Sequence, residues 1–157
     1  MIMHIPDHQG ALERVVAAIR PGGWAVIEDV NFGGPMAAAL AQYTHPAEHA
    51  PLVERLYRAF EAVFEEAHAD AGYGTRLLGG LKAAGLVNVG AEVHTPVVAG
   101  GSEHWVRGSA EQLAVRLAGT GLVTADDVAR FLAVAADGSS HYAPPLMATA
   151  WGQRPPA

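Results

Sequence analysis

The stretch from Arg20 to Asn31, RPGGWAVIEDVN, constrains the fold of this 157-residue chain more than any other. Pro21 cannot continue a helix, and a glycine at Gly22 or Gly23 supplies the left-handed residue that closes one. The run from Trp24 to Ile27 is apolar at every position, which is typical of a parallel strand buried on both faces. The sequence therefore predicts a helix end, a tight turn and a buried parallel strand.

Polar residues follow this strand directly, namely Glu28, Asp29 and Asn31. Open α/β sheets bind their ligands at the carboxyl ends of their strands. We therefore expect a functional site at this edge, although these residues alone do not define its chemistry.

The segment before the helix completes the predicted unit. Met1 to His4 has the pattern of a short strand, which ends before Pro6 because proline has no N–H to donate. Asp7 is expected to cap a helix that extends to about Arg20. A strand, a helix and a second strand form a βαβ unit, whose crossover makes the two strands parallel. The predicted fold class is therefore α/β, with helices on both faces of the sheet.

His4 and Asp29 form the candidate catalytic pair, with Glu28 beside them. Neighbouring parallel strands lie about 4.8 Å apart, so two strand ends are expected to present a histidine and a carboxylate to one ligand. A carboxylate beside a histidine fixes its tautomer and favours the cation, which suits general acid–base catalysis. The alternative is a polar strand end that is merely solvated.

Three stretches share motifs with one known family. The first, from Met3 to Val30, contains MHIPD, RPGGW and IEDV. The second is LLGGLKAAGLVNV at 77–89, and the third is LMATAWG at 146–152. Together they resemble the second half of class I S-adenosylmethionine-dependent methyltransferases that act on small molecules, with the second and third stretches matching the sixth and last strands. The family's first half, with its glycine-rich cofactor loop and its ribose-binding acid, has no counterpart here.

The resemblance implies a single truncated domain over residues 1–157, with a partial Rossmann-like sheet and a helical lid at about 46–71. It implies S-adenosylmethionine as the cofactor, with Met3 and His4 at its methionine end and Asp29 on the substrate side. Because the cofactor-binding half is absent, we expect the isolated chain to bind this cofactor weakly or not at all. The long helix at 46–71 also has a simpler interpretation, a surface helix that packs its apolar stripe on the domain.

Composition argues against several other classes of protein. The net charge of −6 argues against a nucleic-acid partner, since neutralising phosphates requires clustered Lys and Arg. The absence of cysteine excludes disulfides and thiolate metal sites. No apolar run reaches the roughly 18 residues that cross a bilayer, so a cytoplasmic location without membrane association is expected.

Histidines in the second half suggest two further kinds of site. His45 and His49 have a spacing that can share a metal, but no third ligand is nearby, so helix capping or solvent exposure explains them better and no metal is predicted. A hydrolase would need a nucleophile elbow of the form G-x-S-x-G, which the chain lacks. The residues that invite the hydrolase interpretation are His94, His104, His141 and the loop at 137–140.

We therefore expect the C-terminal part of a small-molecule methyltransferase, active with its cofactor only if the missing half is supplied. The alternatives are a cofactor-independent derivative that binds or cyclises a small hydrophobic metabolite, and a truncated product without activity. A homodimer or a partner chain is expected through the edge strand at residues 1–4, which has no charge or proline to protect it before Pro6.

Overall fold

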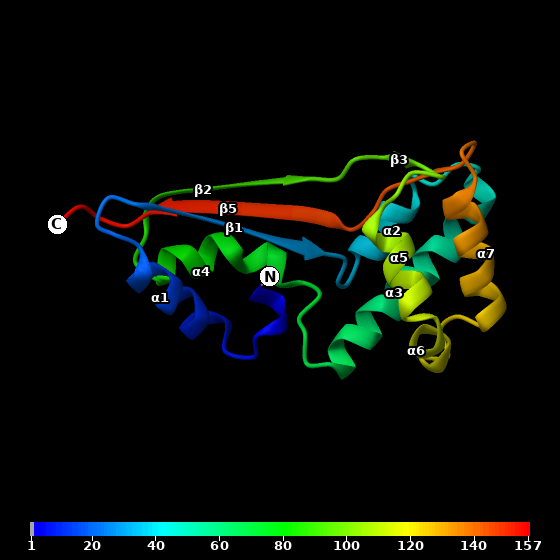
Figure 1. The fold of residues 1–157 in the computed structure, drawn as a ribbon, viewed down its shortest axis with the longest axis horizontal. Coiled ribbons are helices and arrows are strands. Elements are labelled where there is room, and N and C mark those ends of the chain that lie inside the picture. The colour runs from blue at the N-terminus through cyan, green and yellow to red at the C-terminus, as the bar shows by residue number, and fades with distance from the viewer. Residues whose placement is uncertain (1) are drawn as a thin grey trace. The chain divides into compact units, whose positions relative to one another are not determined.

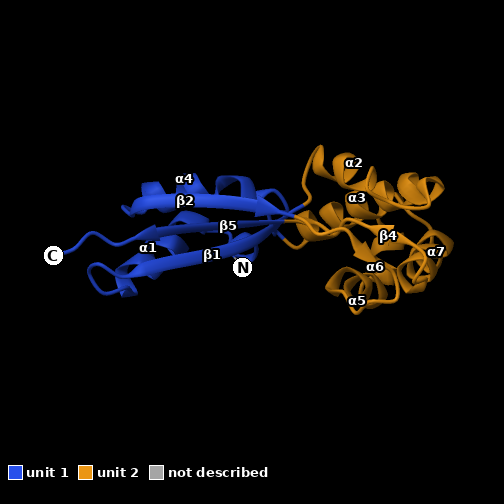
Figure 2. Cartoon of the chain, turned by 90° about the horizontal axis from the view of Figure 1, so that it is seen from above, with its two compact units in different colours: residues 1–31, 68–94, 147–157 blue, residues 32–67, 95–146 orange. Residues whose placement is uncertain are grey.

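The computed structural model describes residues 2–157, which form two compact units (Figure 2). Unit 1 combines the segment that ends at Asn31 with residues 68–94 and 147–157, and unit 2 combines residues 32–67 and 95–146. The sequence predicts one domain without an internal boundary. The structure differs because the chain passes between the units after residues 31, 67, 94 and 146.

Unit 1 consists of a three-stranded sheet, helices and short 3-10 turns. Its elements are η1 (Ile2–His4), α1 (His8–Ala18), β1 (Trp24–Asn31), η3 (Tyr73–Arg76), α4 (Leu77–Ala83), β2 (Val87–His94) and β5 (Leu146–Gln153). The strand order is β1–β5–β2, and β5 runs antiparallel to β2 with Ala91 opposite Ala150. β5 also runs opposite to β1 (Figure 1), where the Arg154 N–H donates to the Gly23 carbonyl at 2.8 Å.

The α/β class is confirmed, but the predicted parallel βαβ unit at the N-terminus is wrong. β1 has the predicted position and Gly22 has the predicted left-handed backbone, with φ of 75°. Its neighbour in the sheet is the antiparallel β5, which comes from the other end of the chain.

The expected strand at residues 1–4 is a 3-10 turn over the residues that the structure describes, and Met1 lies outside them. The reason is that both backbone groups of Met3 are bound by side-chain or loop partners. Its N–H donates to the Asp29 carboxylate at 2.9 Å, and its carbonyl accepts from the Asp70 N–H at 2.9 Å. The predicted association through an edge strand at 1–4 therefore loses its structural basis.

Helices cover one face of the unit 1 sheet, whereas the sequence predicts helices on both faces. α1 and α4 contact each other and lie on the same side of the strands (Figure 1). Residues of β1 and β5 that point to this side include the buried Ala25, Ala148 and Ala150, whereas β2 is exposed along most of its length. Residues that point to the other side include Trp24 and Val26, which are 53% and 69% exposed.

Arg154, which follows β5, holds α1 to the sheet through hydrogen bonds. Its guanidinium donates to the carbonyls of Val16, Ala17 and Ile19 at the C-terminal end of α1, where a helix leaves carbonyls without their usual partner one turn further on. This contact is consistent with α1 ending at Ala18, before the predicted end at Arg20.

Unit 2 is mainly helical. Its elements are α2 (Met36–Ala41), η2 (Ala47–His49), α3 (Ala50–Glu66), β3 (Val98–Ala99), α5 (Trp105–Gln112), α6 (Ala114–Gly119), α7 (Ala125–Ala136) and β4 (His141–Tyr142). α3 occupies most of the predicted lid segment and contacts α2, α6 and α7. Its buried face includes Leu56, Tyr57 and Phe60, so α3 packs its apolar stripe into the core of this unit.

Two helices of unit 2, α5 and α7, begin at side-chain caps. Thr124 and Asp127 form the capping box of α7. α5 begins at Trp105, where the His104 side chain accepts the Val106 N–H. Among residues 2–157, no helix has both the length and the apolar character that crossing a membrane requires.

Candidate functional site

Asp29 is a buried structural carboxylate at the end of β1. Its side chain has no exposed surface, and its two oxygens accept the N–H groups of Met3 at 2.9 Å and Val30 at 3.1 Å. A buried carboxylate needs such partners, because an unpaired charge in the interior is costly. Asp29 therefore holds η1 against the end of the strand.

Glu28 has the opposite environment. It is exposed, and its carboxylate accepts a hydrogen bond from the Thr149 hydroxyl of β5 at 2.7 Å. Because successive strand residues point to opposite faces, Glu28 lies on the uncovered face and Asp29 on the face that the helices cover. The structure thus separates the two candidate carboxylates.

The remaining predicted site residues, Met3 and His4, lie in η1. The Met3 side chain is fully buried, whereas His4, the next residue, is exposed. Since Asp29 binds the backbone of Met3, the structure does bring η1 to the end of β1 as the predicted pairing requires. The contact between Asp29 and η1 is made with the main chain of Met3, so Asp29 positions the turn that ends at His4.

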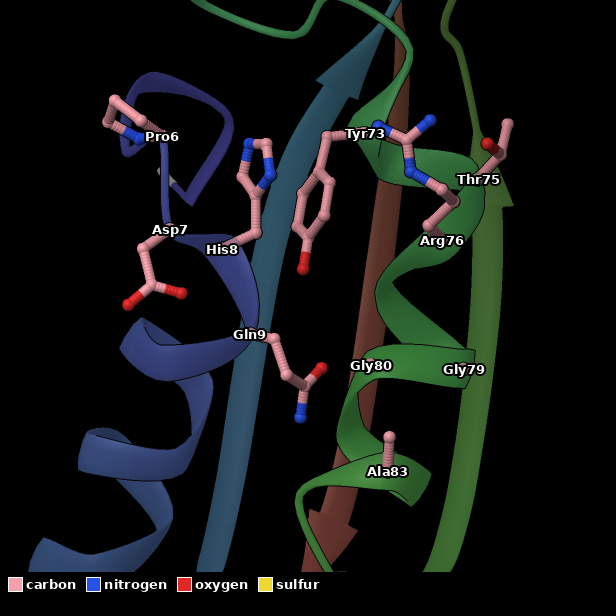
Figure 3. A pocket seen from close by; sticks show the side chains of 10 residues that line it. All are labelled: Pro6, Asp7, His8, Gln9, Tyr73, Thr75, Arg76, Gly79, Gly80 and Ala83. Carbon is pink, nitrogen blue, oxygen red and sulfur yellow. The ribbon is translucent and has the colours of Figure 1, made fainter.

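An open cleft of about 720 Å³ lies in unit 1 between the start of α1 and the segment of η3 and α4 (Figure 3). The rings of His8 and Tyr73 stack with centroids 4.1 Å apart and planes 13° from parallel. The Arg76 guanidinium lies 5.3 Å from the Tyr73 ring centroid and forms an ion pair with Asp70. Figure 3 shows Tyr73 between His8 and Arg76. Gly79 leaves part of the wall without a side chain.

The cleft offers stacking and hydrogen bonding and contains no activated nucleophile. Burial, together with the negative charge of Asp29, raises the pKa of Tyr73, so its phenol stays protonated at neutral pH. The Nε2 atom of His8 is buried and has no hydrogen-bond partner among the described residues. These groups are suited to binding a small molecule that stacks on a ring and accepts or donates a hydrogen bond.

The histidines of unit 2 do not form a metal site. His45 pairs through its backbone with His141, with both N–H···O distances at 2.8 Å, and their ring centroids are 6.5 Å apart. His49 lines a different, small cleft with Arg130 and Asp137. Within the part of the chain that the structure describes, no three potential ligands lie close enough to hold a metal ion.

The Ser/Asp loop that suggests a hydrolase is held together by its own hydrogen bonds. The Ser139 hydroxyl donates to the Asp137 carboxylate at 2.8 Å, and the buried Ser140 hydroxyl donates to the Asp137 and Val134 carbonyls. The Ser139 N–H and hydroxyl lower the pKa of Asp137, and His49 adds to this effect. The hydroxyls serve as turn donors, which does not suit a nucleophile.

The cluster around Tyr73 is not among the sites that the sequence predicts. An aromatic residue between two glycines is a weak signal by itself. Comparison with known proteins adds no family name, because no protein-family model and no curated protein matches this chain.

Proposed function

We propose that this chain is the C-terminal part of an S-adenosylmethionine-dependent methyltransferase that acts on small molecules. The observation that carries the proposal is the assembly of the three resembling stretches into one sheet. They become β1, α4 with β2, and β5, although they lie far apart in the sequence, at residues 20–30, 77–89 and 146–152.

The described residues do not by themselves fit the cofactor. Met3, which the resemblance assigns to the methionine end of the cofactor, is fully buried, and its N–H and carbonyl already bind Asp29 and Asp70. The role proposed for this chain is therefore confined to the acceptor side. There, the exposed His4 is the candidate base, and Asp29 positions the turn that carries it.

Calorimetric titration and a transfer assay test the proposal separately. The purified chain is expected to show no micromolar affinity for S-adenosylmethionine or its demethylated product, and such affinity would contradict the assignment to the acceptor side. The natural protein is then isolated from its cells with any bound polypeptide and incubated with labelled cofactor and small-molecule extract. Methyl transfer that is lost in His4→Ala supports the proposal, and absence of transfer from the complete assembly contradicts it.

A cofactor-independent protein that binds or cyclises a small hydrophobic metabolite is the second candidate. The cleft beside Tyr73 favours it, because this site is formed entirely within unit 1. A lone chain that converts a metabolite without S-adenosylmethionine, and loses this activity when Gly79→Leu fills the cleft, would select this candidate over the first.

A further inference from the structure

The uncovered side of the unit 1 sheet is the feature that the proposed function leaves unexplained. We define the open face by three rows of side chains across the strands, which come from Trp24, Val26 and Glu28 of β1, Trp151 and Thr149 of β5, and Gly90 and Glu92 of β2. The register places Gly90 opposite Trp151 and Glu92 opposite Thr149, and Thr149 binds Glu28. In Figure 2 the strands lie in front of α1 and α4, so no helix of unit 1 covers this side among the described residues.

The open face has an apolar part that is shaped by packing. A Cβ atom at Gly90 would lie 2.6 Å from the Trp151 indole, so glycine at this position is what lets the indole lie over β2. Trp24 and Val26 extend the apolar surface onto β1 and are exposed. Contiguous exposed apolar surface of this kind marks an interaction site more often than a scattered surface residue does.

The charge on the open face has one sign. Glu28 and Glu92 flank Thr149 in one row across the sheet. The nearest basic residue at the sheet's end, Arg154, is turned to the other side, where it binds carbonyls of α1. His94, opposite Met147, follows Glu92 on the same side of β2 and lies outside the rows that define the open face.

From this combination we propose that the open face docks an amphipathic helix of another polypeptide, with an apolar stripe flanked by Lys or Arg. The dimensions agree, because an eight-residue strand such as β1 is about 26 Å long. A helix of about 17 residues has the same length. The apolar stripe would lie on Trp24, Val26 and Trp151, and the cations would meet Glu28 and Glu92.

A second copy of this chain fits the open face less well. Three strands present roughly 14 by 26 Å, so two such faces would bury only about 750 Å² in total, below the roughly 1,200 Å² of a stable dimer. Face-to-face contact about a two-fold axis parallel to the strands would also bring Glu28 and Glu92 close to the same carboxylates of the other copy, which repel. The proposal does not depend on a methyltransferase activity.

Fluorescence anisotropy with two labelled 17-residue peptides tests the proposal. Both carry Leu at helical spacing, and their polar positions are Lys in one and Glu in the other. The Leu/Lys peptide is expected to bind the intact chain with micromolar affinity, and the Leu/Glu peptide at least tenfold more weakly. Equal affinities, or no binding of the Leu/Lys peptide at 100 µM protein, would overturn the proposal.

Val26→Lys and Val93→Lys form a matched pair that separates docking from general attraction to an acidic protein. Both valines lie in strands of unit 1 and are similarly exposed, at 69% and 63%, but Val93 pairs with Ala148 and points to the other side of the sheet. Val26→Lys is expected to weaken binding at least tenfold, and Val93→Lys less than twofold. Equal effects would place the peptide elsewhere. Light scattering that shows a dimer of the unmodified chain, lost only in Val26→Lys, would make a second copy the occupant.

Discussion

The buried carboxylate of Asp29 leads to the most direct test of this structure. Replacing it by asparagine keeps the size of the side chain and one acceptor oxygen, but the other oxygen becomes an NH₂ group. One of the two N–H donors, from Met3 or Val30, then faces another donor in a buried position. A hydrogen bond to a charged group contributes about 1.5–3 kcal/mol, so Asp29→Asn is expected to lower the free energy of unfolding by about 2–3 kcal/mol.

The measurement is urea unfolding followed by far-UV circular dichroism and tryptophan fluorescence, with the thermal midpoint as a second observable. For a chain of this length, 2–3 kcal/mol corresponds to a decrease of roughly 4–12 °C in Tm. Glu28→Gln is the matched control, because this neighbouring carboxylate is exposed and makes a single hydrogen bond to Thr149. Its effect should be below about 1 kcal/mol. If Asp29→Asn unfolds like the unmodified chain, or Glu28→Gln is the more damaging change, the buried role of Asp29 is refuted.

Two further predictions concern a helix cap and a pair of glycines. Burial lowers the pKa of His104 below 6.5, so the unfolded chain binds a proton at His104 more readily than the folded chain does, and the stability that neutral His104 contributes is lost as pH falls below 6.5. His104→Asn keeps a capping oxygen, and its urea midpoint should fall less between pH 7.5 and 5.5 than that of the unmodified chain. Equal falls in the two proteins would contradict the cap. Gly79→Ala should stabilise α4 by about 0.5–1 kcal/mol, since its Cβ meets open space. Gly80→Ala should instead destabilise the folded chain by about 1 kcal/mol or more, because its Cβ would lie 2.6 Å from the buried Leu12 side chain. Equal thermal midpoints of the two variants would contradict this packing.

The parts of the fold that depend on local chemistry were predictable from the sequence. β1 and its preceding turn follow from the RPGGWAVI stretch, and the start of α7 follows from the capping box of Thr124 and Asp127. The last strand, β5, also lies at its predicted position. These elements depend on residues close together in the chain, where propensity and capping act directly.

The parts that failed depend on distant partners. Met1 to His4 has a strand-like sequence, but the turn at η1 is fixed by Asp29 and Asp70, which lie 26 and 67 residues from Met3. Likewise, an apolar strand such as β1 predicts burial on both faces, and nothing local to it indicates that only one face is covered among the described residues. Tertiary contacts overrode the local preference in both cases.

The alternation along β1 decides how the site at its end can work. The sequence predicts that Glu28 lies beside the pair of His4 and Asp29 at one site, but a strand turns successive side chains to opposite faces. Asp29 is thereby committed to the backbone of η1, and Glu28 to the open face with Thr149. Any acid–base role near the turn therefore belongs to His4 with Asp29 acting through the main chain, whereas Glu28 contributes to recognition on the opposite side. If that division holds, His4→Ala impairs methyl transfer without affecting docking of the Leu/Lys peptide. Glu28→Gln then weakens docking of the peptide without affecting methyl transfer. Impairment of both activities by either single change would show that the two faces form one site.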